Sequence, residues 1–394
     1  MENQESKKLP ASIFIFGLVS FLTDVSSDMM YPLLPLFLTQ YLGAKQGFLG
    51  FVEGFADSTA AFFMLFSGVM ADRMRDRSRL VLSGYSLSGF SRCFMAIASH
   101  PFAVFFIRAF DRLGKGIRTS PRDALIADSV HPSVRGKAFG LQRSMDHAGA
   151  VVGPLTAALL LSFWTKNLRS IFVIAAIPGI LTIFLILWKV REIFPDRPST
   201  KISFKFKFPT GRLRIYLVIL FLFLLSCSTD AFLLLRASQL GVPNALLPLL
   251  WMLFNLVKAF TTMPLGMLSD KLGRRSMILI GWLIYTLVYL GFGAAQGTWQ
   301  VWGLFIVYGF FYGFTDGTER ALLADYAEGH DRGQAFGWYY FVTGISALPA
   351  SLIFGMIWQQ AGSQSAFFIS AAISAFAAFL LFLFLTFFPS VRKT

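Results

Sequence analysis

Five carboxylates lie within long apolar segments of this chain, where they could bind and release protons. Asp24 and Asp28 are four residues apart, as are Glu53 and Asp57, and Asp230 lies in a third apolar segment. A four-residue step places two side chains on the same face of a helix. A carboxylate buried away from water pays heavily for its charge, so it can exchange a proton at working pH. We therefore predict that these five acids bind protons.

Cations and aromatic residues in similar segments indicate where a substrate could bind. Arg143, Arg236 and Lys258 lie near the middle of apolar runs that contain few acids, which favours an anionic or zwitterionic substrate. The alternative is that these cations pair with the five carboxylates across a helix bundle. Tyr31 and Trp251 are predicted to line an amphipathic pocket.

One basic, glycine-rich stretch, DRLGKGIRTSPRDALIAD, runs from Asp111 to Asp128 between two apolar segments. It does not have the GxxxxGK[ST] spacing of a loop that cradles phosphate. Three- and four-residue steps instead place five charged residues on one helix face: Arg108, Asp111, Arg112, Lys115 and Arg118. Such a face should turn toward a wet cavity, and we count Arg118 among the substrate-binding candidates. The alternative is a structural network of ion pairs with Asp123 and Asp128.

Composition identifies the elements that must position these residues. Of 394 residues, 55% are hydrophobic and 45 are phenylalanine, more than one soluble core can bury. The sequence predicts an all-α membrane protein, because apolar runs of about 20 residues cross a bilayer as helices. Hydropathy predicts twelve spans, at 12–40, 47–71, 79–98, 101–120, 137–163, 168–189, 213–240, 245–268, 276–296, 299–324, 333–360 and 365–388.

The positions of the basic residues that give the net charge of +14 indicate membrane topology. Lysine and arginine concentrate in alternate loops and in both terminal segments, and this bias is typical of cytoplasmic loops. The pattern predicts cytoplasmic termini and no nucleic-acid partner. The first apolar run is too long for a cleaved signal peptide, so we expect a multi-pass protein of a bacterial cytoplasmic (inner) membrane.

Cofactor chemistry and catalysis are not expected. Cys93 and Cys227 lie in separate apolar runs without metal-ligand spacing. We find no nucleophile constellation and no nucleotide loop. The sequence therefore predicts no metal site, no cofactor and no enzyme activity.

The chain is predicted to consist of two duplicated halves, residues 1–190 and 213–394, joined by a basic, proline-containing linker at 191–212. The segment Ala124–Gly140 matches Ala321–Gly337 at a constant shift of 197 residues. Asp28 similarly corresponds to Asp230. Two six-span halves are the plan of transporters with a binding site near the bilayer midplane.

Local motifs extend this likeness. The loop pattern G-x-x-x-D-[RK]-x-G-[RK]-[RK] is met in the second half by Gly266, Asp270, Lys271, Gly273, Arg274 and Arg275. The first half has Gly68, Asp72, Arg73 and Arg77, with Arg75 in place of glycine. Over essentially its whole length the chain resembles the major facilitator superfamily. The resemblance implies alternating access, with Asp72, Arg73, Asp270 and Lys271 in a cytoplasmic latch; plain topology charges are the alternative.

Two further patterns resemble family motifs. Arg112, Lys115 and Gly116 resemble the span-four motif R-x-x-Q-G-x-G, which implies that Arg112 takes part in proton coupling. The antiporter pattern of span five, G-x8-G-x3-G-P-x2-G-G, fits Gly140, Gly149, Gly153 and Pro154, with Ala157 and Ala158 replacing the last glycines. The resemblance implies proton-driven export, with Gly153 and Pro154 in gating; a merely well-packed helix is the alternative.

These observations predict a proton-coupled antiporter that exports a small organic compound, such as an anionic metabolite, a siderophore-like carboxylate or a drug. The alternative is a symporter that imports an organic anion. A sensor or scaffold without transport is disfavoured by the many intramembrane charges. The expected partners are the substrate, protons and membrane lipid, and we expect a monomer.

Overall fold

The computed structural model describes residues 9–73, 77–131, 134–189, 209–326 and 332–387, and all regular structure within these ranges is helical. The first sequence half contains α2 (Ala11–Met30), α3 (Leu34–Leu36), α4 (Gln46–Arg73), α5 (Arg77–Cys93), α6 (Pro101–Asp128), α7 (Arg135–Phe163) and α8 (Leu168–Lys189). The second half contains α9 (Gly211–Ser226), α10 (Ala231–Gln239), α11 (Leu247–Leu272), α12 (Arg274–Ala294), α13 (Thr298–Tyr326) and α14 (Arg332–Phe387). Short helical turns are η1 (Tyr31–Leu33), η2 (Phe37–Tyr41), η3 (Phe94–Ile97) and η5 (Asn244–Leu246).

Nine helical segments among the described residues are long and apolar enough to cross a membrane. Two more of the predicted spans correspond to α6 and α13, which are equally long but less apolar. The last two predicted spans form the single element α14, which is interrupted at Gly362 by a positive φ of 88°. The all-helical membrane fold is confirmed, while the number twelve and the cytoplasmic termini stay predictions.

Two of the apolar segments are broken, which hydropathy did not predict. After Met30 the chain passes through η1, α3 and η2, and Pro32 and Pro35 stand near the starts of the short helices, where a missing N–H is tolerated. Between α9 and α10 the residues Cys227 to Asp230 are not helical. The amide of Ala231 bonds the Thr229 hydroxyl at 3.4 Å, as short polar side chains do when they compete with a helix.

The described chain divides into two compact units, and each contains a short segment from the other sequence half. The first unit comprises residues 1–43, 59–204 and 244–252, and the second comprises 44–58, 205–243 and 253–394. Helices α4 and α11 are therefore each divided between the units. Most of the predicted linker lies outside the described residues, so the predicted domain boundaries stay predictions.

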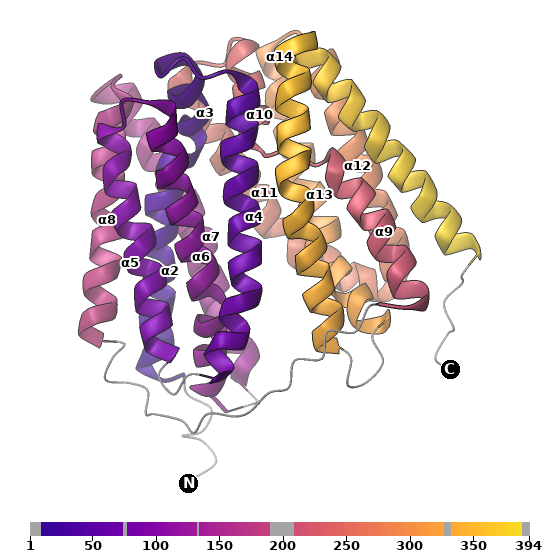
Figure 1. The fold of residues 1–394 in the computed structure, drawn as a ribbon, viewed down its shortest axis with the longest axis horizontal. Coiled ribbons are helices and arrows are strands. Elements are labelled where there is room, and N and C mark those ends of the chain that lie inside the picture. The colour runs from indigo at the N-terminus through magenta and orange to yellow at the C-terminus, as the bar shows by residue number, and fades with distance from the viewer. Residues whose placement is uncertain (1–8, 74–76, 132–133, 190–208, 327–331, 388–394) are drawn as a thin grey trace. The chain divides into compact units, whose positions relative to one another are not determined.

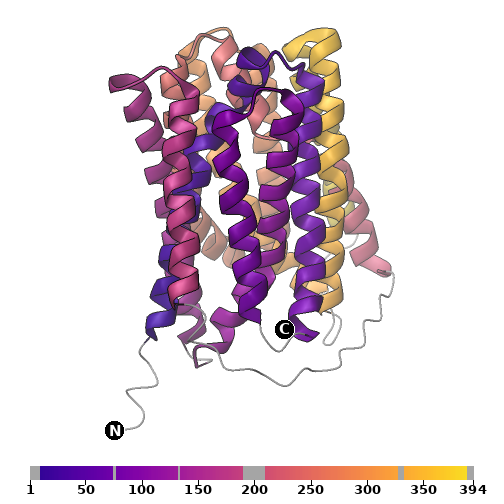
Figure 2. The same cartoon turned by 60° about the vertical axis from the view of Figure 1, so that its left-hand side comes forward.

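Within the first unit, α2 packs on α7 and α8, and α5 packs on α6 and α8. These helices are the indigo to magenta ribbons of Figure 1, and Figure 2 shows the same group after a 60° turn. Within the second unit, α14 packs on α9 and α12, and α12 packs on α13. Small residues bring several of these helices into backbone contact, and this closeness determines where the charged side chains lie.

Candidate functional site

Asp24 lies where α2 packs most closely against α7. A methyl carbon added to Gly149 of α7 would lie 2.9 Å from the Cβ of Asp24, and one added to Gly153 would lie 2.7 Å from the carbonyl oxygen of Val25. Only glycine allows such an approach. Asp28 follows one helical turn after Asp24, so both acids are carried on a helix held tightly by α7.

The other positions of the predicted antiporter motif behave unequally. Pro154 and Ala157 are buried inside α7. Gly140 is different, because a methyl carbon added there would meet no atom within 4 Å. Close packing therefore accounts for the central glycines of the motif, and its role in proton-driven export stays a prediction.

Asp28 contacts a tryptophan that packs on a tyrosine. The indole N–H of Trp251, on α11, donates to Asp28 Oδ1 at 2.9 Å. The rings of Trp251 and Tyr31 have centroids 4.8 Å apart. All three residues belong to the first compact unit. Sequence reasoning predicted each of them separately as a site residue, and the structure brings them into one cluster.

Further charges surround this cluster. Asp24 interacts electrostatically with Asp28 and Asp146, and with the cation of Lys115. Asp28 interacts with Lys115 and Arg112. Several carboxylates in one poorly solvated site cannot all be ionised cheaply, whereas nearby cations favour ionisation. A proton-coupling role for these acids stays a prediction.

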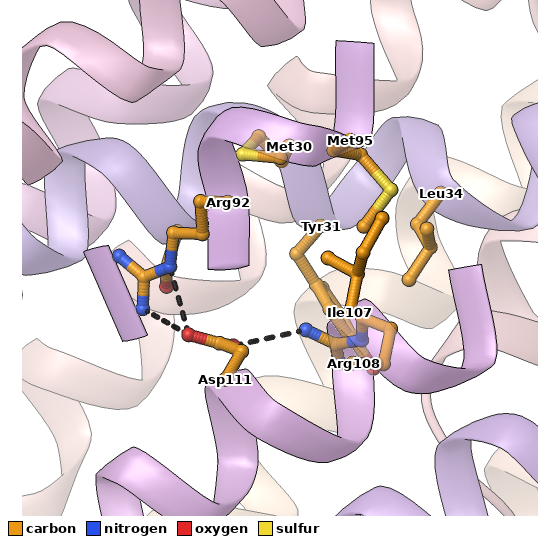
Figure 3. Close-up of a pocket in the computed structure, with 9 residues that line it drawn as sticks. Met30, Tyr31, Leu34, Arg92, Met95, Ile107, Arg108 and Asp111 are labelled. Carbon is orange, nitrogen blue, oxygen red and sulfur yellow. Dashed lines mark hydrogen bonds and ion pairs between the residues drawn. The ribbon is translucent and has the colours of Figure 1, made fainter. Parts of the chain in front are cut away.

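A second buried network lies beside Tyr31, and Figure 3 shows Asp111 between Arg92 and Arg108. Nε and Nη2 of Arg92 lie 2.9 Å from Asp111 Oδ1, and Arg108 Nη1 lies 3.4 Å from Oδ2. Arg92 also donates to the carbonyl of Thr23 at 2.9 Å, and the guanidinium of Arg108 is 5.7 Å from the Tyr31 ring. A cavity of about 20 Å³ adjoins this network, enough for one water molecule.

The charged face of α6 thus takes part in a buried ion-pair network. Its carboxylate is Asp111, on the same helix, and the second cation comes from α5. Asp123 pairs with Arg122 at 2.9 Å, and Asp128 pairs with Arg77 at 2.9 Å. Sequence spacing could have indicated the pairs Arg108–Asp111 and Arg122–Asp123 on α6. It could not indicate the pairing of Asp111 with Arg92 or of Asp128 with Arg77, because both arginines come from α5.

Two predicted substrate-binding cations of the first unit lie elsewhere. Arg118 is buried between α5 and α6, where it donates to the Ser88 hydroxyl at 2.6 Å and lies 4.4 Å from the Tyr85 ring centroid. Arg143 is exposed on α7. This geometry favours a structural role for Arg118, and a substrate role for either residue stays a prediction.

In the second unit, Asp230 lies at the break between α9 and α10. Tyr308 donates its hydroxyl hydrogen to Asp230 Oδ1 at 2.6 Å. Lys258 and Asp57 interact electrostatically with Asp230, and Lys258 Nζ is 4.3 Å from the Tyr312 ring centroid. Interrupted helices frequently form the substrate and ion sites of secondary transporters. The structure therefore brings together Asp57, Asp230 and Lys258, three predicted site residues.

Arg236 has a different surrounding. Its guanidinium donates to the carbonyls of Phe292 and Ala295 at 3.2 and 3.1 Å, and to the Ser363 hydroxyl at 3.0 Å. These carbonyls lie at the C-terminal end of α12, where a cation is favourable. The geometry assigns Arg236 to helix capping, and its predicted substrate contact is untested.

The segment of α4 in the second unit packs closely on α14 and forms hydrogen bonds with its backbone. The Ser58 hydroxyl donates to the carbonyl of Gly344 at 2.6 Å and accepts from the amide of Leu348 at 3.1 Å. Those two backbone groups are four residues apart, the spacing at which backbone groups of an α-helix pair. A methyl carbon at Gly54 would lie 2.9 Å from the Cα of Leu348. Glu53 is fully buried on the same segment.

Only part of the predicted cytoplasmic latch lies within the described residues. The side chains of Asp72, Arg73 and Asp270 lie outside the described residues. Lys271 is exposed at the end of α11. Gly273 has φ of 93° between α11 and α12, a conformation that favours glycine. The positive φ explains why the motif has glycine at this position, while the latch itself stays a prediction.

Sequence reasoning missed Arg92 and Ser58. No acid lies three or four residues from Arg92 in the sequence, so nothing near it in the sequence indicated its ion pair with Asp111. Ser58 continues a row of small residues that includes Gly47, Gly50 and Gly54. Such a row is typical of close helix crossing and could have indicated the contact with α14.

Comparisons with known proteins agree with this architecture. The family model of the Major Facilitator Superfamily matches residues 16–236 and 215–394. An uncharacterized MFS-type transporter of Methanocaldococcus jannaschii is 32% identical over 391 residues, covering 97% of both chains. The multidrug resistance protein MdtH of Photorhabdus laumondii is 29% identical over 155 residues, 38% of each chain. A POT family transporter crystallised with 5-aminolevulinic acid has the same fold, with a TM-score of 0.82, 14% identity and coverage of 98% and 99%. The chain therefore belongs to the major facilitator superfamily of membrane transporters.

Proposed function

We propose that this protein is a proton-coupled antiporter that exports a small organic compound across a bacterial cytoplasmic membrane by alternating access. Asp28 and Asp24 bind the transported proton. Trp251 and Tyr31 form the aromatic wall beside them. The protein works as a monomer with protons and substrate as its partners.

The hydrogen bond of Asp28 with Trp251, whose ring packs on Tyr31, carries this proposal. An intramembrane acid beside aromatic rings and several cations can respond to both a proton and an organic substrate. When substrate binds, it changes the charge and the solvation around Asp28, so the carboxyl group releases its proton. Export is supported by the partial similarity to a multidrug resistance protein and by the tight packing of α2 on the glycines of α7.

Alternating access also needs contacts that form and break. The segment 44–58 packs with α14, and the segment 244–252 packs with the helices of the first sequence half. Because each segment joins the opposite sequence half, we propose that these contacts close one side of the transport path. They separate when the path opens to that side.

A symporter that imports an organic anion is the alternative. Lys258 favours this alternative, because this cation of α11 lies near Asp230 at the break between α9 and α10 and beside the Tyr312 ring. Arg236 gives it less support, since its guanidinium donates to backbone carbonyls. In both modes protons enter the cell, so the two modes differ in the direction of substrate movement relative to the proton.

The test uses purified protein in liposomes with an acidic lumen and a pH-sensitive dye. A panel of organic anions, cations, siderophore-like chelators and drugs is added outside. Antiport predicts that one class releases protons from the acidic lumen, whereas symport predicts that substrate accumulates in the lumen only when the gradient is reversed and the outside is acidic. The thermal stability of the detergent-solubilised protein against the same panel at two pH values identifies the class beforehand.

Asp28→Asn is the decisive variant, because it keeps the shape of the side chain and removes the ionisable group. We expect proton movement to be lost while the protein stays folded. Asp128→Asn is the matched control, since Asp128 lies at the end of α6 in an ion pair with Arg77. If Asp28→Asn transports protons as the native protein does, Asp28 is not the coupling residue.

A further inference from the structure

Glu319 of α13 is a buried carboxylate that the proposed mechanism does not use. The indole N–H of Trp282, on α12, donates to Glu319 Oε1 at 3.2 Å. The hydroxyl of Tyr339, on α14, lies 3.1 Å from Oε2. Glu319 is only 7% exposed. Three helices therefore enclose one acid, and both of its oxygens contact neutral groups.

The charged neighbours of Glu319 belong to its own helix. Asp316 and Arg320 interact with it electrostatically, but Arg320 Nη2 lies 2.5 Å from Asp316 Oδ1 and is engaged there. From α12 and α14 the contacting groups are an indole and a phenol. Cys227, which follows α9, is the other titratable neighbour. In the described part of the chain, Glu319 forms no ion pair.

These contacts suit both protonation states of the acid. The indole N–H can only donate, so Oε1 accepts from Trp282 whether or not Glu319 is ionised. A phenol can donate or accept. Tyr339 therefore donates to Oε2 of the carboxylate and accepts from Oε2–H of the carboxylic acid. Glu319 can gain or lose a proton without exchanging its partners.

The internal duplication shows that this position is not a fixed feature of the fold. A shift of 197 residues relates Arg122 to Glu319 and Tyr85 to Trp282. The same shift relates glycine contacts. Gly84 approaches Arg118 of α6, and Gly281 approaches Thr315 of α13.

The two related positions are chemically opposite. In the first half, Arg122 is permanently charged, pairs with the adjacent Asp123 at 2.9 Å and lies 3.4 Å from the Ser20 hydroxyl. In the second half, Glu319 is titratable, and the adjacent Arg320 pairs with another residue. At this position the cation of the first half is paired with its neighbour, whereas the carboxylate of the second half is held by an indole and a phenol.

We propose that Glu319 is a second proton-binding carboxyl, carried by the second six-helix half. A proton from the aqueous side joins the Glu319 carboxylate, which becomes neutral, and it later returns to water. This inference rests on the proposed proton coupling and adds a second site to it.

Infrared difference spectroscopy of the purified protein tests the proposal without a substrate. Spectra in acidic and alkaline buffer should show the carbonyl stretch of a protonated carboxyl group appearing on acidification. We expect that part of this band is lost in Glu319→Gln and kept in Asp316→Asn, the control on the same helix. A band that is identical in the native protein and in Glu319→Gln would overturn the proposal.

A second measurement serves if Glu319→Gln does not fold. Protonation of Glu319 changes the charge beside the indole of Trp282, so the native protein should show a pH-dependent tryptophan emission. This pH dependence should be smaller in Trp282→Phe, in which Trp251 beside Asp28 still responds to pH. Equal pH dependence in both proteins would refute titration at Glu319.

The liposome assay separates this inference from the proposed function. If native protein moves no protons, proton coupling fails, while the infrared result still decides whether Glu319 titrates. If native protein moves protons, we expect Glu319→Gln to lose that movement and to keep substrate binding. Full proton-driven transport by Glu319→Gln would overturn the assigned role.

Discussion

Removing the Ser58 hydroxyl should weaken the contact between α4 and α14 and shift the conformational equilibrium of the protein. This hydroxyl bridges the carbonyl of Gly344 and the amide of Leu348. The next residue, Pro349, has no N–H, so α14 already lacks one ladder bond there. The bridge therefore stabilises α14 at a turn that lacks one ladder bond, but only while α4 is packed against it.

The expected magnitude follows from counting hydrogen bonds. Ser58→Ala removes two bonds to the backbone. If Gly344 and Leu348 pair with each other instead, one bond is regained, and the net loss is about 1 kcal/mol. If close packing prevents that pairing, two buried groups stay unsatisfied and the loss reaches about 2 kcal/mol or more. When α4 and α14 are separated, Gly344 and Leu348 can pair with each other in both the native protein and Ser58→Ala. The loss therefore affects only the packed state, and the ratio of separated to packed protein should rise by about 5- to 30-fold.

Distance measurements between spin labels would detect this shift. Labels at Lys45 and Gln360, both exposed, report on the two helices after Cys93 and Cys227 are replaced by serine. We expect Ser58→Ala to increase the population with the longer distance.

Ser346→Ala is the control, because its hydroxyl bonds to carbonyls of its own helix. It should leave the distance distribution unchanged. A Ser58→Ala protein with the native distribution, or with a smaller separated population, would refute the reasoning that the bridge holds α4 to α14.

Two further predictions concern stability. Gly153→Ala should lower the melting temperature in detergent, because the added methyl would lie 2.7 Å from a carbonyl oxygen of α2 and overpacking costs about 1–3 kcal/mol. Gly140→Ala, in the same motif but in open space, should be neutral, and equal melting of the two variants would contradict the packing argument. Arg236→Gln should destabilise the protein by about 1–3 kcal/mol, because buried carbonyls at the end of α12 lose their donor. Native melting with weaker binding of anions would instead favour the substrate role.

Much of the fold was predictable because membrane spans are encoded locally. Long apolar runs, loop charges and the repeat each appear in the sequence without any knowledge of packing. The spacing of Asp24 and Asp28 correctly indicated one helix face. Hydropathy averages over many residues, however, so it did not detect the four-residue break before α10.

The site was only partly predictable, because its contacts join helices far apart in sequence. Tyr31, Trp251 and Asp28 were identified one by one from their residue types. The contacts of Trp251 with Asp28 and Tyr31 depend on how α11 and α2 are rotated, which no single helix encodes. For the same reason the sequence predicted Arg236 to be an anion ligand, although its guanidinium donates hydrogen bonds to carbonyls at the end of another helix.

The sequence by itself determined the membrane class, the duplication, the family and the positions of the intramembrane acids, because each depends on residue type and spacing along one chain. Tertiary structure alone decided the partners of each charge: Arg92 for Asp111, neutral donors for Glu319, and the backbone of α14 for Ser58. In a poorly solvated interior a polar group must find its partner within the protein. Which partner is available depends on the packing of neighbouring helices.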